Sequence, residues 1–160
     1  MKKELVINDK KIGFNTEPYI IAELSGNHNG DINRAIKLID AAVSSGANAI
    51  KLQTYTADTL TIDSNRSEFV IRGGPWSGQK LYDLYKQAST PWEWHPTIFQ
   101  YAKQKNIHCF SSPFDDSAVD FLDSLSAPAY KIASFEIVDI PLIKKASSKN
   151  KPLIMSTGVA

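Results

Sequence analysis

Cysteine and long hydrophobic runs are what this sequence has least of. Cys109 is the single cysteine among 160 residues, which excludes an internal disulfide and favours a reducing compartment. No apolar stretch approaches the roughly 20 residues that a membrane-spanning helix needs. Polar residues at 8–11 follow the short basic start, so no signal peptide is predicted. These absences together predict a soluble, cytoplasmic protein.

An excess of charge of either sign is also missing. The 18 basic side chains are balanced by 17 acidic ones, so no overall field would attract nucleic acid or a membrane surface. The three histidines, His28, His95 and His108, do not have the spacing of metal ligands. We therefore expect small-molecule substrates as partners, and no metal ligands within this chain. For His28, function and packing remain equally open.

The chain alternates short apolar strands with amphipathic helices. Strands are predicted at 18–23, 49–53, 107–112, 129–133 and 152–156, and helices at 32–43, 81–88, 93–105, 115–125 and 140–148. Such alternation indicates parallel strands with crossover helices. A β-hairpin over 4–14, turning at 8–10, precedes the series. The polar stretch 55–78 is longer than most loops, which indicates a functional or partly structured segment.

Two architectures fit this alternation, an open doubly wound sheet and the first half of a (β/α)8 barrel. Strands buried on both faces of an open sheet are nearly all apolar, whereas Lys51, Gln53 and Lys131 interrupt these strands. Polar residues also gather where the strands end, which is where a barrel builds its active site. A whole barrel takes about 250 residues. We therefore predict a truncated α/β barrel, with a hairpin domain at 1–15 and a five-stranded partial barrel at 16–160.

Lys51 and Lys131 are the strongest candidates for chemistry. Each lies in mid-strand between apolar residues, where an ammonium group needs a bound anion, a carboxylate partner or a lowered pKa. The functional interpretation is a phosphate or carboxylate site, or a lysine that forms a Schiff base. The alternative is a lysine that guards a sheet edge or extends its ammonium group to solvent.

Hydroxyl and carboxyl groups stand at the predicted strand ends. Ser112, Ser134 and Ser156 could bind phosphate, although serines in such places also cap helices and turns. Glu23 and Glu136 are candidate acid–base groups, or structural partners of the two lysines.

Five segments together resemble the N-acetylneuraminate (sialic acid) synthase family. They are IAELSGNHNG at 21–30, IKLQTY at 50–55, FSSPFD at 110–115, YKIASFE at 130–136 and STG at 156–158. They follow the family's order and span almost the whole chain. The segment 73–95, with GGPWSG, LYDLY and TPWEWH, is similar to the pseudaminic acid branch of this family.

The resemblance implies a TIM barrel that condenses phosphoenolpyruvate with 2,4-diacetamido-2,4,6-trideoxy-altrose, giving pseudaminic acid and phosphate. It assigns Lys51, Gln53, Ser112, Lys131, Ser134 and Ser156 to phosphoenolpyruvate, and catalytic roles to Glu23, Glu136 and Lys51. It also implies a homodimer and a divalent cation, Mn²⁺ or Mg²⁺, whose histidine ligands are expected on later strands. The chain alone is accordingly expected to be inactive.

Other interpretations stay open. The sugar could be the precursor of N-acetylneuraminate or legionaminate. Lys51 or Lys131 could form an imine, which would make the protein a lysine-dependent aldolase, although the polar serine surroundings disfavour the lowered pKa that this needs. The chain could also be a non-catalytic half-barrel that binds anions. Its first and fifth strands would then be unpaired edges, so we expect the isolated chain to dimerise or to be poorly soluble.

Overall fold

The computed structural model describes residues 4–158 and contains two sheets. The strands β1 (Glu4–Ile7) and β2 (Lys10–Gly13) form an antiparallel hairpin. The second sheet is parallel, with the order β3-β4-β5-β6-β7. Its strands are β3 (Ile21–Glu23), β4 (Ala49–Thr54), β5 (His108–Pro113), β6 (Tyr130–Ile132) and β7 (Leu153–Met155). Each strand neighbours the next in sequence, as the predicted alternation requires.

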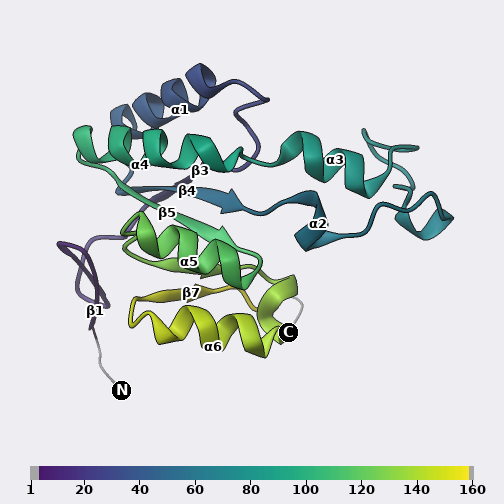
Figure 1. Ribbon diagram of the computed structural model, residues 1–160. Coiled ribbons are helices and arrows are strands. Elements are labelled where there is room, and N and C mark those ends of the chain that lie inside the picture. The colour runs from purple at the N-terminus through teal and green to yellow at the C-terminus, as the bar shows by residue number, and fades with distance from the viewer. Residues whose placement is uncertain (1–3, 159–160) are drawn as a thin grey trace.

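Helices connect the parallel strands (Figure 1). They are α1 (Ile32–Ser44), α2 (Ala57–Leu60), α3 (Leu81–Ala88), α4 (His95–Gln104), α5 (Asp116–Ser124) and α6 (Ile140–Ser148). Short 3-10 turns lie at η1 (Ser67–Phe69), η2 (Trp92–Trp94) and η3 (Phe135–Val138). No helix within residues 4–158 is long and apolar enough to cross a membrane.

Local chemistry explains where several helices begin and end. Asp31, Asp115 and Asp139 each accept a hydrogen bond from a backbone N–H in the first turn of α1, α5 and α6, which satisfies donors that the helix itself cannot. Gly46, with φ of +77°, follows the end of α1 in the left-handed conformation that glycine adopts without strain. These residues explain the two ends of α1, and the helix predicted at 32–43 is confirmed.

The two faces of the parallel sheet have different partners. Outward-facing Ile50, Leu52 and Cys109 pack against residues of α1 and α4, while Tyr130 and Ile132 pack against residues of α5 and α6. The alternate residues of the same strands point to the other face. An open doubly wound sheet would carry helices on both faces, whereas these four helices cover one. The sheet is therefore a curled half-barrel, as predicted.

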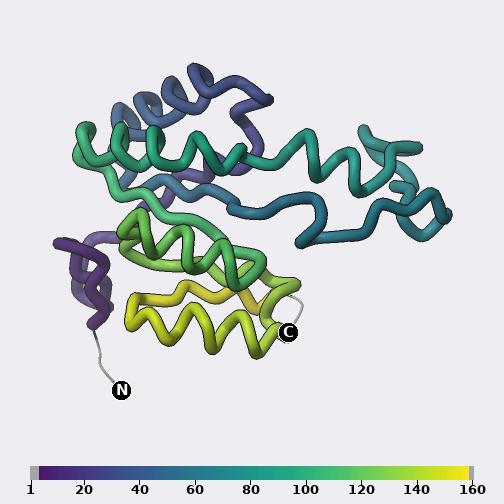
Figure 2. Tube along the Cα trace, in the orientation of Figure 1, coloured from purple at the N-terminus to yellow at the C-terminus, as the bar shows by residue number. Residues whose placement is uncertain are grey.

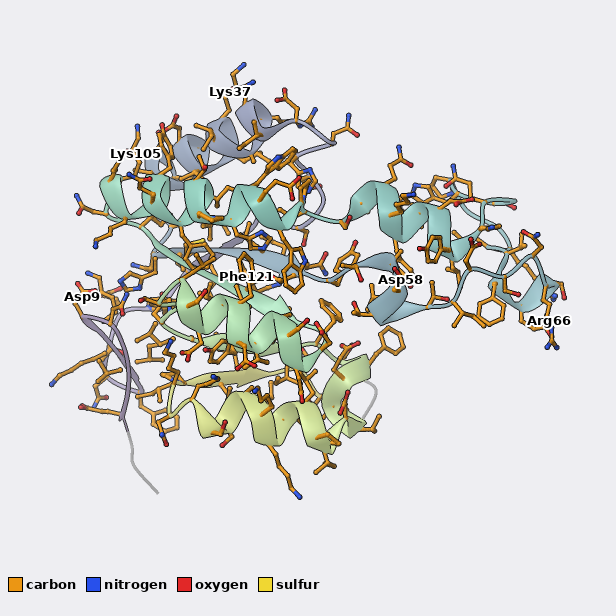
Figure 3. All side chains as sticks on the ribbon, viewed as in Figure 1. Asp9, Lys37, Asp58, Arg66, Lys105 and Phe121 are labelled. Atoms are coloured by element: carbon orange, nitrogen blue, oxygen red, sulfur yellow. The ribbon has the colours of Figure 1, made fainter. Side chains whose placement is uncertain are left out.

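The hairpin closes the inner face where the strands begin. Ile7 is fully buried there in a cluster with Ala49, Phe110 and Ala129. The turn of the hairpin is attached to β5, because Asp9 Oδ1 lies 2.9 Å from His108 Nε2. The opposite ring nitrogen, Nδ1, lies 2.7 Å from the Tyr19 hydroxyl. Figure 3 shows Asp9 at this end of the molecule.

The segment between β4 and α4 projects beyond the carboxyl ends of the strands (Figure 2). The polar stretch predicted over 55–78 is partly structured, with α2, η1 and an isolated antiparallel bridge between Val70 and Lys80. Two predicted boundaries were wrong. The first strand begins at Ile21 because 18–20 make no ladder pairs, and the helix expected from 93 opens as the 3-10 turn η2 before α4 begins at His95.

Removal of the hairpin's buried side chain should destabilise the whole unit. Ile7→Ala is expected to lower the free energy of unfolding by about 2–5 kcal/mol, because it leaves a cavity between the hairpin and the sheet. Val6→Ala is the matched control, since Val6 is 49% exposed and Ile7 is 0% exposed. Urea denaturation would measure both. Equal losses from the two variants would show that the hairpin does not contribute through this core.

Candidate active site at the carboxyl ends of the strands

Lys51 and Glu23 form the central ion pair of the inner face. They are register partners on β4 and β3, and Lys51 Nζ lies 2.7 Å from Glu23 Oε2 and 2.8 Å from Oε1. The Ser25 hydroxyl donates to the same carboxylate at 2.6 Å. The Lys51 side chain is only 12% exposed, while that of Glu23 is 48% exposed. The ammonium group is thus partly removed from water and the carboxylate reaches the rim.

Lys131 supplies a second cation to the same inner face. Its Nζ donates to the Ile132 carbonyl at 3.1 Å, and no carboxylate among residues 4–158 forms an ion pair with it. Burial lowers the pKa of Lys131, and the positive charge of Lys51 lowers it further, while Glu23 and Glu136 act in the opposite direction. The two lysines therefore repel each other electrostatically, and an anion between them would relieve that repulsion.

Glu136, in η3, is less exposed to solvent than Glu23. Burial raises the pKa of Glu136, against the lowering effects of its backbone hydrogen bond and of Lys131. Its Oε2 atom is buried and has no hydrogen-bond partner among residues 4–158. Unpartnered buried oxygens are rare in folded proteins. This carboxyl group can therefore hold a proton more readily than a carboxyl group in water, or accept a hydrogen bond from a ligand.

The remaining predicted site residues lie at the ends of β4, β5, β6 and β7. Gln53 and Ser112 are register partners at the ends of β4 and β5, and Ser112 is buried. Ser112 does not cap α5, since Asp115 has that role. Ser134 follows β6, and Ser156 follows β7, where its backbone N–H donates to the Ile132 carbonyl at 3.1 Å.

Taken together, this arrangement is suited to an anion. A Cβ atom added at Gly158 would lie 3.8 Å from Ser134 Cβ, so the loops after β6 and β7 are adjacent. Two cations, hydroxyl groups and an amide thus occupy the inner face at or just beyond the strand ends, where barrels place their catalytic groups. Phosphate or carboxylate would find charge and hydrogen-bond donors there.

Two buried histidines form hydrogen bonds near the carboxyl ends of the strands, a role that the sequence did not predict. His95 Nε2 lies 2.9 Å from Thr54 Oγ1, and its Nδ1 lies 3.2 Å from the Pro91 carbonyl. His28 Nε2 lies 3.1 Å from Thr90 Oγ1, and its Nδ1 accepts from the Gly30 N–H. The sequence carries only a slight signal for this framework. Thr54 is a polar residue, whereas the other outward-facing residues of β4, Ile50 and Leu52, are apolar. Both rings hold the junction between α3 and α4.

Burial keeps both rings neutral. It lowers the pKa of His95 to about 4, despite the raising effect of hydrogen bonds to Pro91 and Trp92, and it also lowers the pKa of His28. Burial likewise raises the pKa of the Cys109 thiol, which fits the buried, inert cysteine that its position predicts. In the part of the chain that the structure describes, no three His, Cys, Asp or Glu side chains could together hold a metal ion.

Several known proteins are similar to this chain in sequence and in fold. The family model described as the NeuB family matches residues 38–160. The chain is 50% identical over 149 residues to a pseudaminic acid synthase of Campylobacter jejuni, covering 92% of this chain and 43% of that protein. It is 38% identical to an N,N'-diacetyllegionaminic acid synthase of Legionella pneumophila, covering 94% of this chain and 42% of that one.

A solved structure agrees with these sequence matches. The sialic acid synthetase of Leptospira borgpetersenii, solved with citrate, superposes with a TM-score of 0.83 and is 31% identical. The match covers 98% of this chain and 50% of that one. The chain therefore spans half or less of the length of these relatives.

Acid should weaken the fold through His95. The unfolded ring takes up a proton near its ordinary pKa of 6.5, while the folded ring resists protonation until about pH 4, so the stability present above pH 6.5 is lost as the pH falls. Between pH 7 and pH 5 this should remove roughly 1–2 kcal/mol. His95→Gln, which cannot be protonated, should show a smaller decrease. Urea titrations at the two pH values would test this, and equal decreases would contradict it.

Proposed function

This chain belongs to the NeuB family, and from that premise we propose that the full-length protein carrying it is a pseudaminic acid synthase. It would condense phosphoenolpyruvate with 2,4-diacetamido-2,4,6-trideoxy-altrose to give pseudaminic acid and phosphate. The observation that carries this proposal is the pair of part-buried lysines on the inner face, Lys51 with one carboxylate partner and Lys131 with none among residues 4–158. The 50% identity to a pseudaminic acid synthase favours this sugar over the related ones.

The proposed reaction forms one carbon–carbon bond and breaks one carbon–oxygen bond. Carbon 3 of phosphoenolpyruvate attacks the aldehyde carbon of the open-chain sugar, whose oxygen takes up a proton. Water adds at carbon 2 and gives up both its protons, one balancing the proton taken up by the aldehyde oxygen and one going to phosphate, which leaves with the bridging oxygen as the carbonyl group at carbon 2 forms. Negative charge moves onto the phosphate as its bond to carbon 2 breaks, so fixed cations beside it stabilise the transition state.

Each predicted site residue has a role in this scheme. Lys51 and Lys131 would bind the phosphate and carboxylate groups, since their mutual repulsion is relieved by an anion. Ser112, Ser134, Ser156 and Gln53 would donate hydrogen bonds to the same ligand. The exposed carboxylate of Glu23 would act near the attacking water at carbon 2. Glu136, whose pKa is raised by burial, would exchange a proton close to the reacting groups.

A divalent cation and a second subunit belong to the proposal for the full-length protein. The described residues do not provide a set of metal ligands, and the histidine ligands of the Mn²⁺ or Mg²⁺ ion are expected on later strands of the full-length protein. A homodimer is the expected assembly. Sedimentation of the full-length protein should give twice the mass of one chain, and a monomer that retains activity would contradict this.

A lysine-dependent aldolase is the alternative from a different class of enzyme. The lowered pKa of Lys131 is the observation that favours it. Against it, Lys51 is held by a carboxylate that stabilises its charged form. Borohydride reduction with pyruvate would trap an imine on an aldolase and leave the synthase unmodified.

Phosphate release from phosphoenolpyruvate tests the proposal. The full-length protein with Mn²⁺ should release phosphate with the diacetamido-trideoxy sugar, and more slowly with N-acetylmannosamine. Lys51→Met and Lys131→Met should each lower kcat/KM for phosphoenolpyruvate by about 100-fold or more, because each removes a cation from the developing charge. Lys144→Met is the matched control, since Lys144 is exposed on α6.

The outcomes separate the alternatives. No release by the folded full-length protein with either sugar would overturn the synthase assignment. Faster release with N-acetylmannosamine would move the protein to the sialic acid branch. Full activity in both lysine variants would show that these cations do not hold the substrate.

A further inference from the structure

A line of buried hydrogen bonds runs behind the proposed substrate site. The Ser111 and Thr54 hydroxyl oxygens are 2.7 Å apart, Thr54 Oγ1 is 2.9 Å from His95 Nε2, and His95 Nδ1 is 3.2 Å from the Pro91 carbonyl. Ser111, Thr54 and His95 are each 0% exposed. The line joins β5, β4 and the first residue of α4. We refer to these four residues as the relay.

The Pro91 carbonyl at one end of the relay fixes which group donates in each of its hydrogen bonds. A carbonyl oxygen only accepts, so the hydrogen on His95 Nδ1 must point to Pro91. In the neutral ring the other nitrogen, Nε2, then accepts from the Thr54 hydroxyl. The Thr54 oxygen is left to accept from Ser111. With the ring of His95 neutral, as its burial favours, each hydrogen in the relay has an acceptor.

The relay lies directly behind two residues of the proposed site. Thr54 and Ser111 point to the outer face of the barrel, next in sequence to Gln53 and Ser112, which point to the inner face. Gln53 and Ser112 are register partners. The position of this pair therefore depends on how the ends of β4 and β5 are held from the outside.

The same relay attaches the projecting segment to the strands. Trp92 stacks on Phe121 of α5 with ring centroids 4.8 Å apart, and its Nε1 donates to the Tyr55 carbonyl at 3.4 Å. Phe121 is labelled in Figure 3 on the helical side of the sheet. The turn from Pro91 to His95 thus contacts both the segment that follows β4 and the helix that follows β5.

We propose that His95 is a positioning residue, which sets the placement of Gln53 and Ser112 for phosphoenolpyruvate through Thr54 and Ser111. The inference rests on the proposed function for the identity of the ligand. His95 itself touches neither the site nor the substrate. Because a displacement of about 1 Å in a substrate-binding group can cost on the order of 100-fold in rate, loosening the two strand ends should be visible in kinetics.

A matched pair of substitutions separates this role from simple stability. Thr54→Val removes a buried hydroxyl from the relay. Thr90→Val makes the same change at another buried threonine of the same junction, whose hydroxyl bonds His28 and not the strand ends. Thr54→Val loses two buried hydrogen bonds and Thr90→Val loses one, so both should be destabilised, Thr54→Val somewhat more. Only one should alter the substrate site.

The kinetic experiment uses the full-length protein and phosphate release. Thr54→Val and His95→Phe should each raise KM for phosphoenolpyruvate by about tenfold while KM for the sugar changes less than about twofold. The double variant should be no worse than the more severe single variant, because both break one relay. His95→Gln, whose side-chain oxygen can accept from Thr54, should recover most of the loss. Thr90→Val should keep the wild-type KM.

Each result decides the inference. Equal effects of Thr54→Val and Thr90→Val on KM would overturn it, as would additive effects in the double variant or no rescue by glutamine. If His95→Phe does not fold, the two threonine variants still decide, since valine keeps the shape of threonine. An inactive wild-type protein would instead mean that the proposed function has failed. The inference on positioning fails separately, when the wild type is active and the KM of the relay variants does not change.

Discussion

Two lysine ammonium groups on the inner face of a barrel sheet constrain the rest of this structure. Charge is costly to remove from water unless it is paired, and the two lysines meet that cost differently. Lys51 is paired with Glu23 across adjacent strands, whereas Lys131 has only the Ile132 carbonyl as its hydrogen-bond partner among residues 4–158. The repulsion between them disfavours the site when it is empty and favours an anion within it. Such a cost in stability is typical of functional sites, which supports the proposal that an anion binds here.

The half-barrel can hold these lysines because its outer face is apolar and its inner face becomes polar toward the strand ends. The outward residues of the strands are apolar and covered by α1, α4, α5 and α6. The inward residues change character along each strand, from the apolar cluster around Ile7 and Phe110 where the strands begin to the polar groups where they end. The hairpin covers the apolar end and leaves the polar end open. Parallel strands make this possible, because all their carboxyl ends meet at the same rim.

Buried hydrogen bonds on the outer face of the sheet hold the ends of β4 and β5, which distinguishes them from an ordinary sheet edge. Hydroxyl groups on the outer face of β4 and β5 would be unsatisfied in an apolar layer, and the His95 ring satisfies them. The same ring holds the turn that leads back from the projecting segment. Under the proposed positioning role, residues far from the chemistry would alter the site through a few buried hydrogen bonds, whose loss is costly because no water replaces them.

Much of this was determined by the sequence alone. Alternating apolar segments predicted the order of strands and helices. Lys51, Gln53 and Lys131 within apolar strands distinguished a barrel from an open sheet and predicted the inner site. These features are local, since they follow from the periods of strands and helices and from the cost of burying charge. Only the tertiary structure decided that Glu23 pairs with Lys51 and that no carboxylate among residues 4–158 pairs with Lys131. It alone also decided that the Glu136 Oε2 atom is buried without a hydrogen-bond partner among residues 4–158, and that His95 bonds to Thr54. Such pairings join residues from different strands and helices, so they depend on how closely the folded chain brings those elements together, and no spacing along the sequence records that distance.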